Sequence, residues 1–380
     1  PRLCVRSFEK NKMIPFLKKR PPNALIGLKL ERNRLEGVVL RRSGASLQVQ
    51  RTFQASLSLD PLTNDPELVG REIRNHLNEA GVRERRCAVC MPLNWALTLQ
   101  TQIPSIPEAD VSGFLDIEAE KGFPYAPHDL AISVSRYPAP GGTEYATIVA
   151  IPKNHLDLLE QTLRAARLKP VSFSLAISAL QTSNKEGGPG AVALLVGENN
   201  VELQVSSGSG VVALRSLEGV VETEGNQKHI DADLVSREIK ITLGQLPRTL
   251  SETVRKLRVF GRPELAQPLL KEIQLRVKAM GLEVETGAVP PMNGFPLPLP
   301  ADKSLSPTVC HAARCILGYP PGFEFLPPKV RAWSQLSTRF SSRKLVSVGA
   351  AAGAVVLLVS GAFIVQHLKL ASLQSKWRAI

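Results

Sequence analysis

Near its start the chain shows three short apolar runs separated by polar turns at Arg32 and Ser43. Turns of this kind join antiparallel neighbours, so the pattern predicts a three-stranded meander. A helix should follow, because Asp65 suits an N-cap, Pro66 a first turn and Gly81 a helix end. The predicted strands are residues 24–30, 35–41 and 47–51, with two more at 86–93 and 96–103 after the helix. The apolar face predicted for the helix consists of Leu68, Ile73 and Leu77.

The same order of elements recurs in the second half of the chain. A repeated meander followed by a helix predicts two similar α/β subdomains that face each other, which is the plan of the actin-like ATPase fold. In that fold the turn between the first two strands of each half holds the nucleotide phosphates. The second set of predicted strands is 191–196, 201–205 and 211–215, and the helix is 231–246.

A smaller inserted α/β module is predicted between the halves, at residues 104–180. It should contain an acidic helix, two strands and an amphipathic helix. Residues 286–307 are rich in proline and predict a loop or linker. The elements predicted in the module are the helix 107–121, the strands 131–137 and 145–151, and the helix 154–168 with Leu156, Leu159, Leu163 and Ala166 on one face.

Residues 345–365 carry no charge and are enough, as a helix, to cross a hydrocarbon core of about 30 Å. A buried core helix is the alternative. More Lys and Arg residues precede this segment than follow it, which predicts a single-pass protein with a cytoplasmic N-terminal domain. The flanking cations are Lys329, Arg331, Arg339, Arg343 and Lys344 before it, and Lys369, Lys376 and Arg378 after it.

A heptad-like seam follows the apolar segment, and it predicts the start of a coiled coil at residues 366–380. A short amphipathic extension of the membrane helix explains the same spacing. The chain begins at Pro1 and stops inside this pattern, so we expect a piece of a longer protein. The seam consists of Leu370, Leu373, Trp377 and Ile380.

The formal charge of +13 is concentrated near the N-terminus, where the first 43 residues hold twelve Lys or Arg and three Glu. This basic segment, centred on residues 1–23, predicts an acidic partner surface. Anionic lipid headgroups suit a membrane-bound chain, since each Lys or Arg near them contributes about 1 kcal/mol. A nucleic-acid partner is not expected, because no zinc spacing, RNP motif or helix-turn-helix accompanies the charge.

Five cysteines without a signal peptide predict a reducing compartment. Cys87 and Cys90 lie in a strand-like run and are expected to be buried thiols, with metal or redox work as the alternative. The histidines are scattered, and no Ser/His/Asp or Cys/His arrangement is visible. No catalytic residue and no metal site are therefore expected.

Several segments resemble the type IV pilus assembly protein PilM and the cytoplasmic part of the type II secretion protein GspL, over about residues 14–318. This resemblance implies the actin-like fold for residues 24–318 and a place in an inner-membrane assembly platform. The segments that carry it are residues 103–108, 117–125, 150–153 and 159–170.

The membrane-proximal linker, residues 319–344, resembles the start of PilN, whose short motif docks on PilM. The resemblance implies that this motif docks in cis on the actin-like domain, since apolar side chains followed by proline suit a groove. An ordinary linker with some buried side chains is the alternative. The residues of the motif are Phe323, Phe325, Leu326 and Pro327.

The nucleotide loops of this family are altered in the chain. Lys29 stands where the family has the metal-binding Asp, Glu31 where it has a Gly and Glu36 where it has a Lys. In the second half Gly197 to Asn199 replaces the second Asp-x-Gly, and Gly261 lies in the remnant of a Gly-rich run. These changes reverse the local charge, so we expect no Mg-ATP hydrolysis and no cofactor.

The resemblance implies a non-enzymatic scaffold in the bacterial inner membrane, part of a homo- or hetero-oligomer. Its implied partners are PilO-like and PilC-like platform proteins, the cytoplasmic assembly ATPase and an anionic membrane surface. Two alternatives belong to other classes: a membrane-tethered actin-like protein that still binds or hydrolyses ATP, and a membrane-bound nucleic-acid binder.

Overall fold

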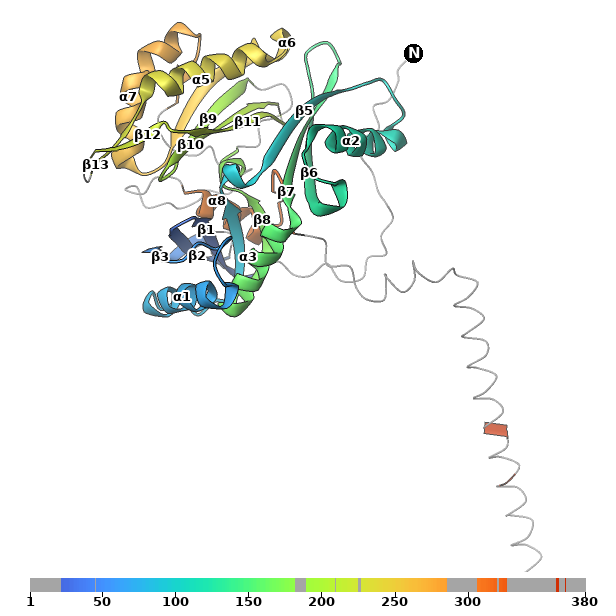
Figure 1. The fold of residues 1–380 in the computed structure, drawn as a ribbon, viewed down its shortest axis with the longest axis vertical. Helices are drawn as coiled ribbons and strands as arrows, with labels where there is room; N and C mark the ends of the chain where they lie inside the picture. Colours follow the sequence, from blue (N-terminus) through green and yellow to red (C-terminus); the bar gives the residue numbers. More distant parts are fainter. Residues whose placement is uncertain are drawn as a thin grey trace, which may run out of the picture. The chain divides into compact units, whose positions relative to one another are not determined.

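Two five-stranded sheets of the same plan dominate the computed structural model (Figure 1). In each sheet a three-stranded antiparallel meander is continued by two strands parallel to its first strand. The sequence repeat and the α/β fold class are thereby confirmed. The structure describes residues 22–326 except 45, 182–188, 209, 225–226, 286–305 and 320, and beyond them Ser360, Gly361 and Gln366.

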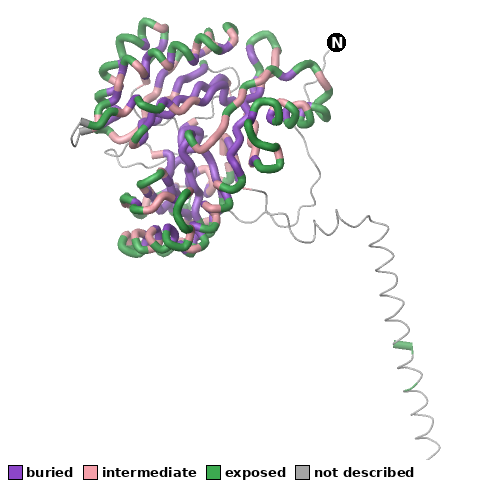
Figure 2. The backbone as a smooth tube through the Cα atoms, in the orientation of Figure 1, coloured by how far each residue is buried: buried purple, intermediate pink, exposed green. Residues whose placement is uncertain are grey.

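The first subdomain is built on the sheet β3-β2-β1-β4-β8. Helices α1 and α3 cover one face of this sheet and α8 covers the other, so β1 and β4 are almost entirely buried (Figure 2). Its strands are β1 (Ala24–Glu31), β2 (Arg34–Ser43), β3 (Ser46–Ser56), β4 (Arg86–Met91) and β8 (Lys169–Leu175). Its helices are α1 (Pro66–Glu79), α3 (Lys153–Ala165), α4 (Ala176–Ala179) and α8 (Pro307–Leu317).

Helix α1 begins as predicted, because the Asp65 side chain accepts a hydrogen bond from the Glu67 amide. Its predicted apolar face is wrong at Leu68, whose surface is 47% exposed. The buried stripe instead passes through Val69 and Ile73. Gly70 explains this rotation: a Cβ there would lie 2.5 Å from Ala165 of α3, so the two helices approach each other through the glycine.

The second subdomain repeats the plan with the sheet β11-β10-β9-β14-β15. Helices α5 and α7 pack against each other over this sheet (Figure 1). A two-stranded hairpin, β12 with β13, precedes α5. The strands are β9 (Gly190–Val196), β10 (Asn200–Ser207), β11 (Gly210–Glu218), β12 (Val221–Glu224), β13 (Gln227–Ile230), β14 (Val254–Phe260) and β15 (Glu283–Val284). The helices are α5 (Ala232–Gln245), α6 (Arg248–Ser251) and α7 (Pro263–Ala279).

A three-stranded sheet, β5-β7-β6, and helix α2 form the small module. The structure assigns α3 to the first subdomain, because its apolar face packs with α1. The module therefore overlaps the expected residues 104–180 without coinciding with them: β5 precedes residue 104, and α3 and β8 lie outside the module. Its elements are β5 (Leu97–Ile103), α2 (Glu108–Gly122), β6 (Leu130–Pro138) and β7 (Glu144–Pro152), with one-turn helices η1 (Leu93–Trp95) and η2 (Pro127–Asp129) beside them.

The predicted membrane helix at 345–365 lies outside the described residues, apart from Ser360 and Gly361. The basic segment before residue 22, the Pro-rich loop and the coiled-coil residues Leu370, Leu373, Trp377 and Ile380 also lie outside them. Among the residues that are described, no helix has both the length and the apolar character needed to cross a bilayer.

Gly27 of β1 sets how closely α8 can approach the first sheet. A Cβ at this position would lie 2.2 Å from the carbonyl oxygen of Thr308 in α8. We expect Gly27→Ala to displace α8 and to lower the free energy of unfolding by about 1–3 kcal/mol, the usual cost of overpacking. Chemical denaturation measures this change. Gly113→Ala is the matched control: its Cβ meets open space in the exposed part of α2, so it should be neutral or stabilising. Equal stability of the two variants would contradict the close approach.

Candidate functional site

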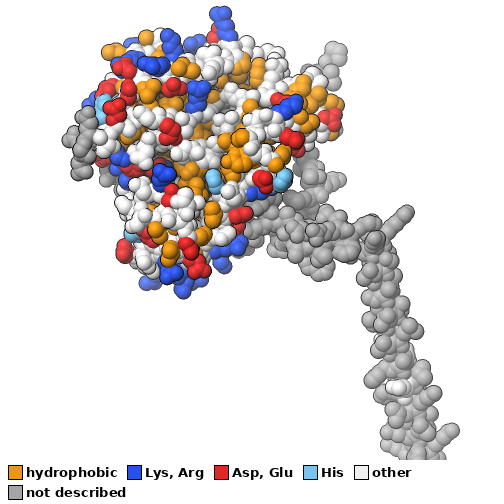
Figure 3. Space-filling model, in the orientation of Figure 1, with side chains coloured by type: hydrophobic (Ala, Val, Ile, Leu, Met, Phe, Trp, Pro, Cys, Tyr) orange, Lys and Arg blue, Asp and Glu red, His pale blue; other side chains and the backbone are white. Residues whose placement is uncertain are grey.

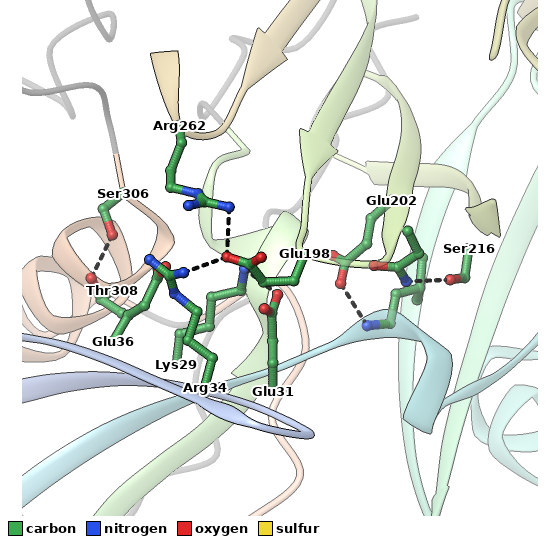
Figure 4. Close-up of polar contacts among 12 residues, drawn as sticks. Lys29, Glu31, Arg34, Glu36, Glu198, Glu202, Ser216, Arg262, Ser306 and Thr308 are labelled. Carbon is green, nitrogen blue, oxygen red and sulfur yellow. Dashed lines mark hydrogen bonds and ion pairs between the residues drawn. The ribbon is translucent and has the colours of Figure 1, made fainter. Parts of the chain in front are cut away.

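Two turns, one from each subdomain, face each other across the interface between the large sheets. The β1–β2 turn follows Glu31, and the β9–β10 turn contains Glu198. An ion pair between Arg34 of β2 and Glu198 joins the two turns (Figure 4). These turns correspond to the two loops that the sequence indicated as altered phosphate loops, and the structure brings them together.

Lys29 of β1 is a buried cation at this interface. Its surface is 5% exposed, and its Nζ lies 2.6 Å from Oε1 of Glu31. Burial by itself lowers the pKa of Lys29, but the carboxylates of Glu31, Glu36 and Glu202 outweigh that effect and raise the pKa above its ordinary value. Lys29 is therefore a charged group that is compensated from inside the protein.

Glu202 of β10 is the buried carboxylate on the second subdomain's side. Its surface is 2% exposed, and its Oε1 accepts a hydrogen bond of 2.8 Å from the amide of Leu93. Burial raises the pKa of Glu202 to about 7, although the nearby Lys29 charge and the Leu93 amide oppose the rise. Glu202 and Lys29 thus couple the two sheets electrostatically at the base of the interface.

Glu198 is the centre of a second cluster, nearer the surface. Besides Arg34, its carboxylate pairs with Lys228 and Arg262, each at 2.6 Å. Burial alone raises the pKa of Glu198, but these cations outweigh it and hold the pKa below its usual value. Three segments that are far apart in the sequence, β2, β13 and the β14–α7 turn, therefore meet on one carboxylate. Figure 4 shows the Arg34 and Arg262 pairs with Glu198.

A cavity of about 630 Å³ remains between these clusters and the start of α8. Its polar lining is crowded with Glu31, Glu36, Glu198 and Glu264, while Phe53 and Val196 supply apolar wall. Gly261 lines this cavity. Asn199 does not; it lines a neighbouring hollow of about 430 Å³ together with Glu31 and Glu198.

Most charged groups that line this cavity are paired with one another. A hydrated Mg²⁺ needs free carboxylates, and a triphosphate needs amides or cations that face it. Lys29 is committed to Glu31, and the cations near Glu198 are committed to that carboxylate. Within the described residues, no group of three His, Cys, Asp or Glu side chains is placed to hold a metal ion.

The sequence prediction missed Glu202 and the three cations around Glu198. The sequence held no clear signal for Glu202, because Glu202 and Gln204 alternate with apolar residues as on a half-exposed strand, whereas the structure buries β10 along its whole length. Gln204 is satisfied by the Ser178 hydroxyl at 2.9 Å. No signal in the sequence indicated that Arg34, Lys228 and Arg262 converge, since their meeting depends on the packing of the two subdomains.

Residues 321–326 form a second site, on the first subdomain. Phe323 and Phe325 are 1% and 3% exposed and belong to its core, while Leu326 is partly buried against it. The Phe325 amide donates a hydrogen bond of 3.0 Å to the Phe173 carbonyl of β8, the edge strand of the sheet. Pro327, the last residue of the predicted motif, lies outside the described residues.

Glu324 fixes this segment between the first subdomain and the small module. Its carboxylate accepts hydrogen bonds from the Phe173 amide at 2.9 Å and from the Ser172 hydroxyl, and its own amide donates to the Ser133 hydroxyl of β6 at 3.2 Å. Burial raises the pKa of Glu324, and these hydrogen bonds oppose the rise. The sequence motif indicated the phenylalanines but not this carboxylate.

Cys87 and Cys90 are buried in β4, as predicted. Burial raises the pKa values of both thiols, which keeps them protonated and unreactive at neutral pH. Cys310 of α8 is buried in the same core, and Cys315 is partly buried. These thiols act as small apolar side chains.

Two repeated α/β subdomains, with facing turns beside a shared cavity, define the class of this protein as the actin-like ATPase fold. Among solved structures, the chain is similar to a chain of the PilM-PilN type IV pilus biogenesis complex, with 16% identity and a TM-score of 0.52 over 69% of this chain and 87% of that chain. That similarity shows a shared fold.

Two further solved structures match with lower TM-scores. One is the cytoplasmic domain of EpsL, an inner-membrane component of the type II secretion system of Vibrio cholerae, with 12% identity, a TM-score of 0.45, and coverage of 78% and 96% of the two chains. The other is a protein of actin-like ATPase fold and unknown function from Bacteroides thetaiotaomicron, with 9% identity, a TM-score of 0.41, and coverage of 72% and 94%. No family model and no curated protein matches the sequence.

The raised pKa of Glu202 predicts how stability depends on pH. Its pKa is about 7 in the folded protein against an ordinary 4.5, so its burial costs little below about pH 4.5 and lowers stability progressively as the pH rises towards 7. Lys29 stays charged throughout this range because its pKa is raised. When the pH is raised from 5.5 to 8, the free energy of unfolding should therefore fall by roughly 2 kcal/mol less in Glu202→Gln than in the unmodified chain.

Urea unfolding at several pH values measures this difference. Glu120→Gln, on the exposed face of α2, is the control and should keep the pH dependence of the unmodified chain. A Glu202→Gln profile that is parallel to that of the unmodified chain would show that Glu202 does not titrate in this range.

Proposed function

We propose that this chain is a membrane-bound, non-enzymatic scaffold in a bacterial assembly platform of the type IV pilus or type II secretion kind. The observation that carries the proposal is the seating of residues 321–326 in the core of the first subdomain. This segment lies directly before the basic linker and the apolar residues 345–365. It is the connection between a folded domain of the PilM type and the predicted membrane helix.

The geometry of the segment supports a docked recognition motif more than a loose linker. One backbone hydrogen bond to an edge strand, two buried aromatic side chains and a hydrogen-bonded Glu324 carboxylate are the features of a short peptide motif seated in a groove. The solved structure of similar fold is described as a complex of PilM with PilN. We propose that a PilN-like motif occupies the equivalent of a partner site here in cis.

The interface between the subdomains supports the absence of ATPase activity. Lys29 and Glu31 neutralise each other at the first turn, and Glu198 is saturated by cations at the second. A phosphate group entering the cavity would meet Glu264, which repels it, while Glu31 and Glu36 are already paired with Lys29 and Arg34. Binding would then require the buried Lys29–Glu31 pair or the partly exposed pairs of Glu198 to break.

The proposed partners follow from the same role. PilO-like and PilC-like membrane proteins and the cytoplasmic assembly ATPase would contact a scaffold whose own motif is already engaged. The predicted seam of Leu370, Leu373, Trp377 and Ile380 would pair with a partner helix outside the membrane. The N-terminal domain would lie in the cytoplasm.

A second function, ATP binding by a tethered actin-like protein, is favoured by one observation. The cavity of about 630 Å³ at the subdomain interface is of a size that admits a small ligand. Its position corresponds to the nucleotide cleft of the fold class. The two functions are separated by a direct binding measurement.

The docking of residues 321–326 is tested by limited proteolysis of the full chain in detergent. Phe325→Asp combined with Leu326→Asp places charges in an apolar core, so the segment should be released and trypsin should cleave at Lys329 and Arg331 at least about tenfold faster. Leu275→Asp, at a site that is 80% exposed, is the control and should not change cleavage.

Thermal unfolding of the same samples shows whether the domain remains folded. If the double variant unfolds, Glu324→Ala provides the second measurement, because it removes the hydrogen bonds to Ser172 and Phe173 without adding a charge. A folded variant whose linker resists trypsin as before would refute cis-docking.

Nucleotide binding is tested by calorimetry on the full chain with ATP and Mg²⁺. We expect no binding in the micromolar range, because the cavity presents carboxylates and already paired cations to the phosphates. Binding in that range would favour the tethered actin-like protein, and phosphate release would then decide whether it is an ATPase.

A further inference from the structure

Basic residues from three parts of the chain lie together at one end of the strands of the first sheet. Strands β1, β4 and β8 are parallel neighbours, so their N-terminal ends lie side by side. We use the word edge below for this row of strand ends, not for the outermost strand β8. Arg86 begins β4 opposite Lys169, which begins β8, and the Lys169 amide donates to the Arg85 carbonyl at 2.7 Å. Arg41 of β2 pairs with Ala24 at the start of β1, and so lies at this edge too.

The side chains at this edge, which we call the basic edge, are exposed and uncompensated. None of them forms an ion pair within the part of the chain that the structure describes. The carboxylate of Glu84, which lies among them, accepts hydrogen bonds from the amides of Arg85 and Arg86. The basic edge consists of Arg41, Arg42, Arg83, Arg85, Arg86, Arg167 and Lys169.

The cations are also crowded. Arg74 of α1 donates a hydrogen bond to the Ala165 carbonyl at the end of α3, close to Arg167. Partial desolvation and the neighbouring charge of Arg167 lower the pKa of Arg74. At the lower end of the first subdomain, over α1 and the end of α3, Lys and Arg side chains are visible with Asp and Glu side chains among them (Figure 3). An excess of cations that form no ion pair among the described residues favours an external anionic partner.

The path of the chain is an independent observation that concerns the same edge. Gly322 lies near Ser178 and Gln181, beyond the C-terminal end of β8, whereas Phe325 pairs with Phe173 inside that strand. The segment therefore runs antiparallel to β8, towards Lys169 and the basic edge. The sequence continues from there through the basic linker to the apolar residues 345–365.

The N-terminal side of the domain leads to the same place. The Asn23 carbonyl accepts a hydrogen bond of 2.7 Å from the Arg42 amide, so the chain enters the fold at the basic edge. The residues before it include seven Lys or Arg and one Glu. Both segments that flank the domain are basic, and both join it on the side where its own unpaired cations lie.

We propose that the basic edge is the face with which the first subdomain lies against anionic phospholipid headgroups. Guanidinium groups bind phosphate through paired hydrogen bonds, and several weak contacts of this kind add to one another when the chain is already held at the membrane. The inference rests on the membrane-bound location in the proposed function. The inference adds a surface of the folded domain that contacts the membrane, and it states that the basic edge of the first subdomain faces the bilayer.

The test compares the full chain in nanodiscs of neutral phosphatidylcholine and in discs with about one third phosphatidylglycerol. Hydrogen exchange of peptides covering residues 80–87 and 165–170 is measured in both. Exchange should be at least threefold slower in the anionic discs, and 0.5 M salt should remove the difference because it screens headgroup attraction. The triple variant Arg85→Gln, Arg86→Gln, Lys169→Gln should lose the protection.

The matched control neutralises three exposed cations on the second subdomain, Arg237, Lys240 and Lys271, and should keep the protection. Equal exchange in the two kinds of disc, or equal protection in the triple variant, would overturn the proposal. Protection of the same peptides by duplex DNA in detergent, without protection by anionic discs, would assign the edge to nucleic acid instead.

Failure of the proposed function gives a different result. A chain that is not retained in neutral discs is not membrane-anchored, whatever its basic edge does. In that case flotation with anionic vesicles tests the edge: binding that the triple variant loses and the control keeps supports it, and absence of such binding overturns it.

Discussion

The ion pairs buried between the β1–β2 turn and the β9–β10 turn are the interaction on which the relation of the two subdomains depends. Lys29 is a cation in a place that excludes water, and it is tolerated because Glu31 touches it and Glu202 approaches it from the opposite sheet. Glu198 is tolerated for the reciprocal reason. Each of these charges has more than one partner, and loss of all of them would leave a charge in the interface uncompensated, which is more costly than a single pair is stabilising.

This arrangement favours one relative orientation of the subdomains over others. An apolar interface of the same size tolerates sliding, whereas charges that must meet at 2.6 Å do not. All the charges that hold this orientation of the two subdomains belong to the chain itself. A cleft held by internal pairs fits the proposed scaffold, which would keep a constant shape while others assemble on it.

Much of the fold followed from the sequence, because short turns and apolar runs encode the meanders locally. The repeated strand order and the Asp65 cap depend on neighbouring residues and were predicted. Leu68 was misassigned because the orientation of α1 depends on Gly70 meeting α3. Helix α3 was grouped with the small module because its sequence shows an apolar face but not the surface that the face covers.

The site could be predicted only in part, for a similar reason. Lys29 and Glu31 were recognisable as departures from a family pattern, and Phe323 and Phe325 as part of a motif. The convergence of Arg34, Lys228 and Arg262 on one carboxylate joins residues from distant segments, and no local pattern encodes it. Seven unpaired cations at one sheet edge likewise become a surface only when parallel strands align their ends.

The direction of residues 321–326 along β8 has a mechanical consequence. A segment that is antiparallel to an edge strand, and is pulled from the end nearest that strand's start, is loaded along the strand axis. Its hydrogen bond to Phe173, its Glu324 contacts and its two buried rings then resist in shear, together, rather than peeling apart one after another. If the proposed membrane helix pulled on this segment, the load would reach the core of the first subdomain along the direction in which these contacts resist together.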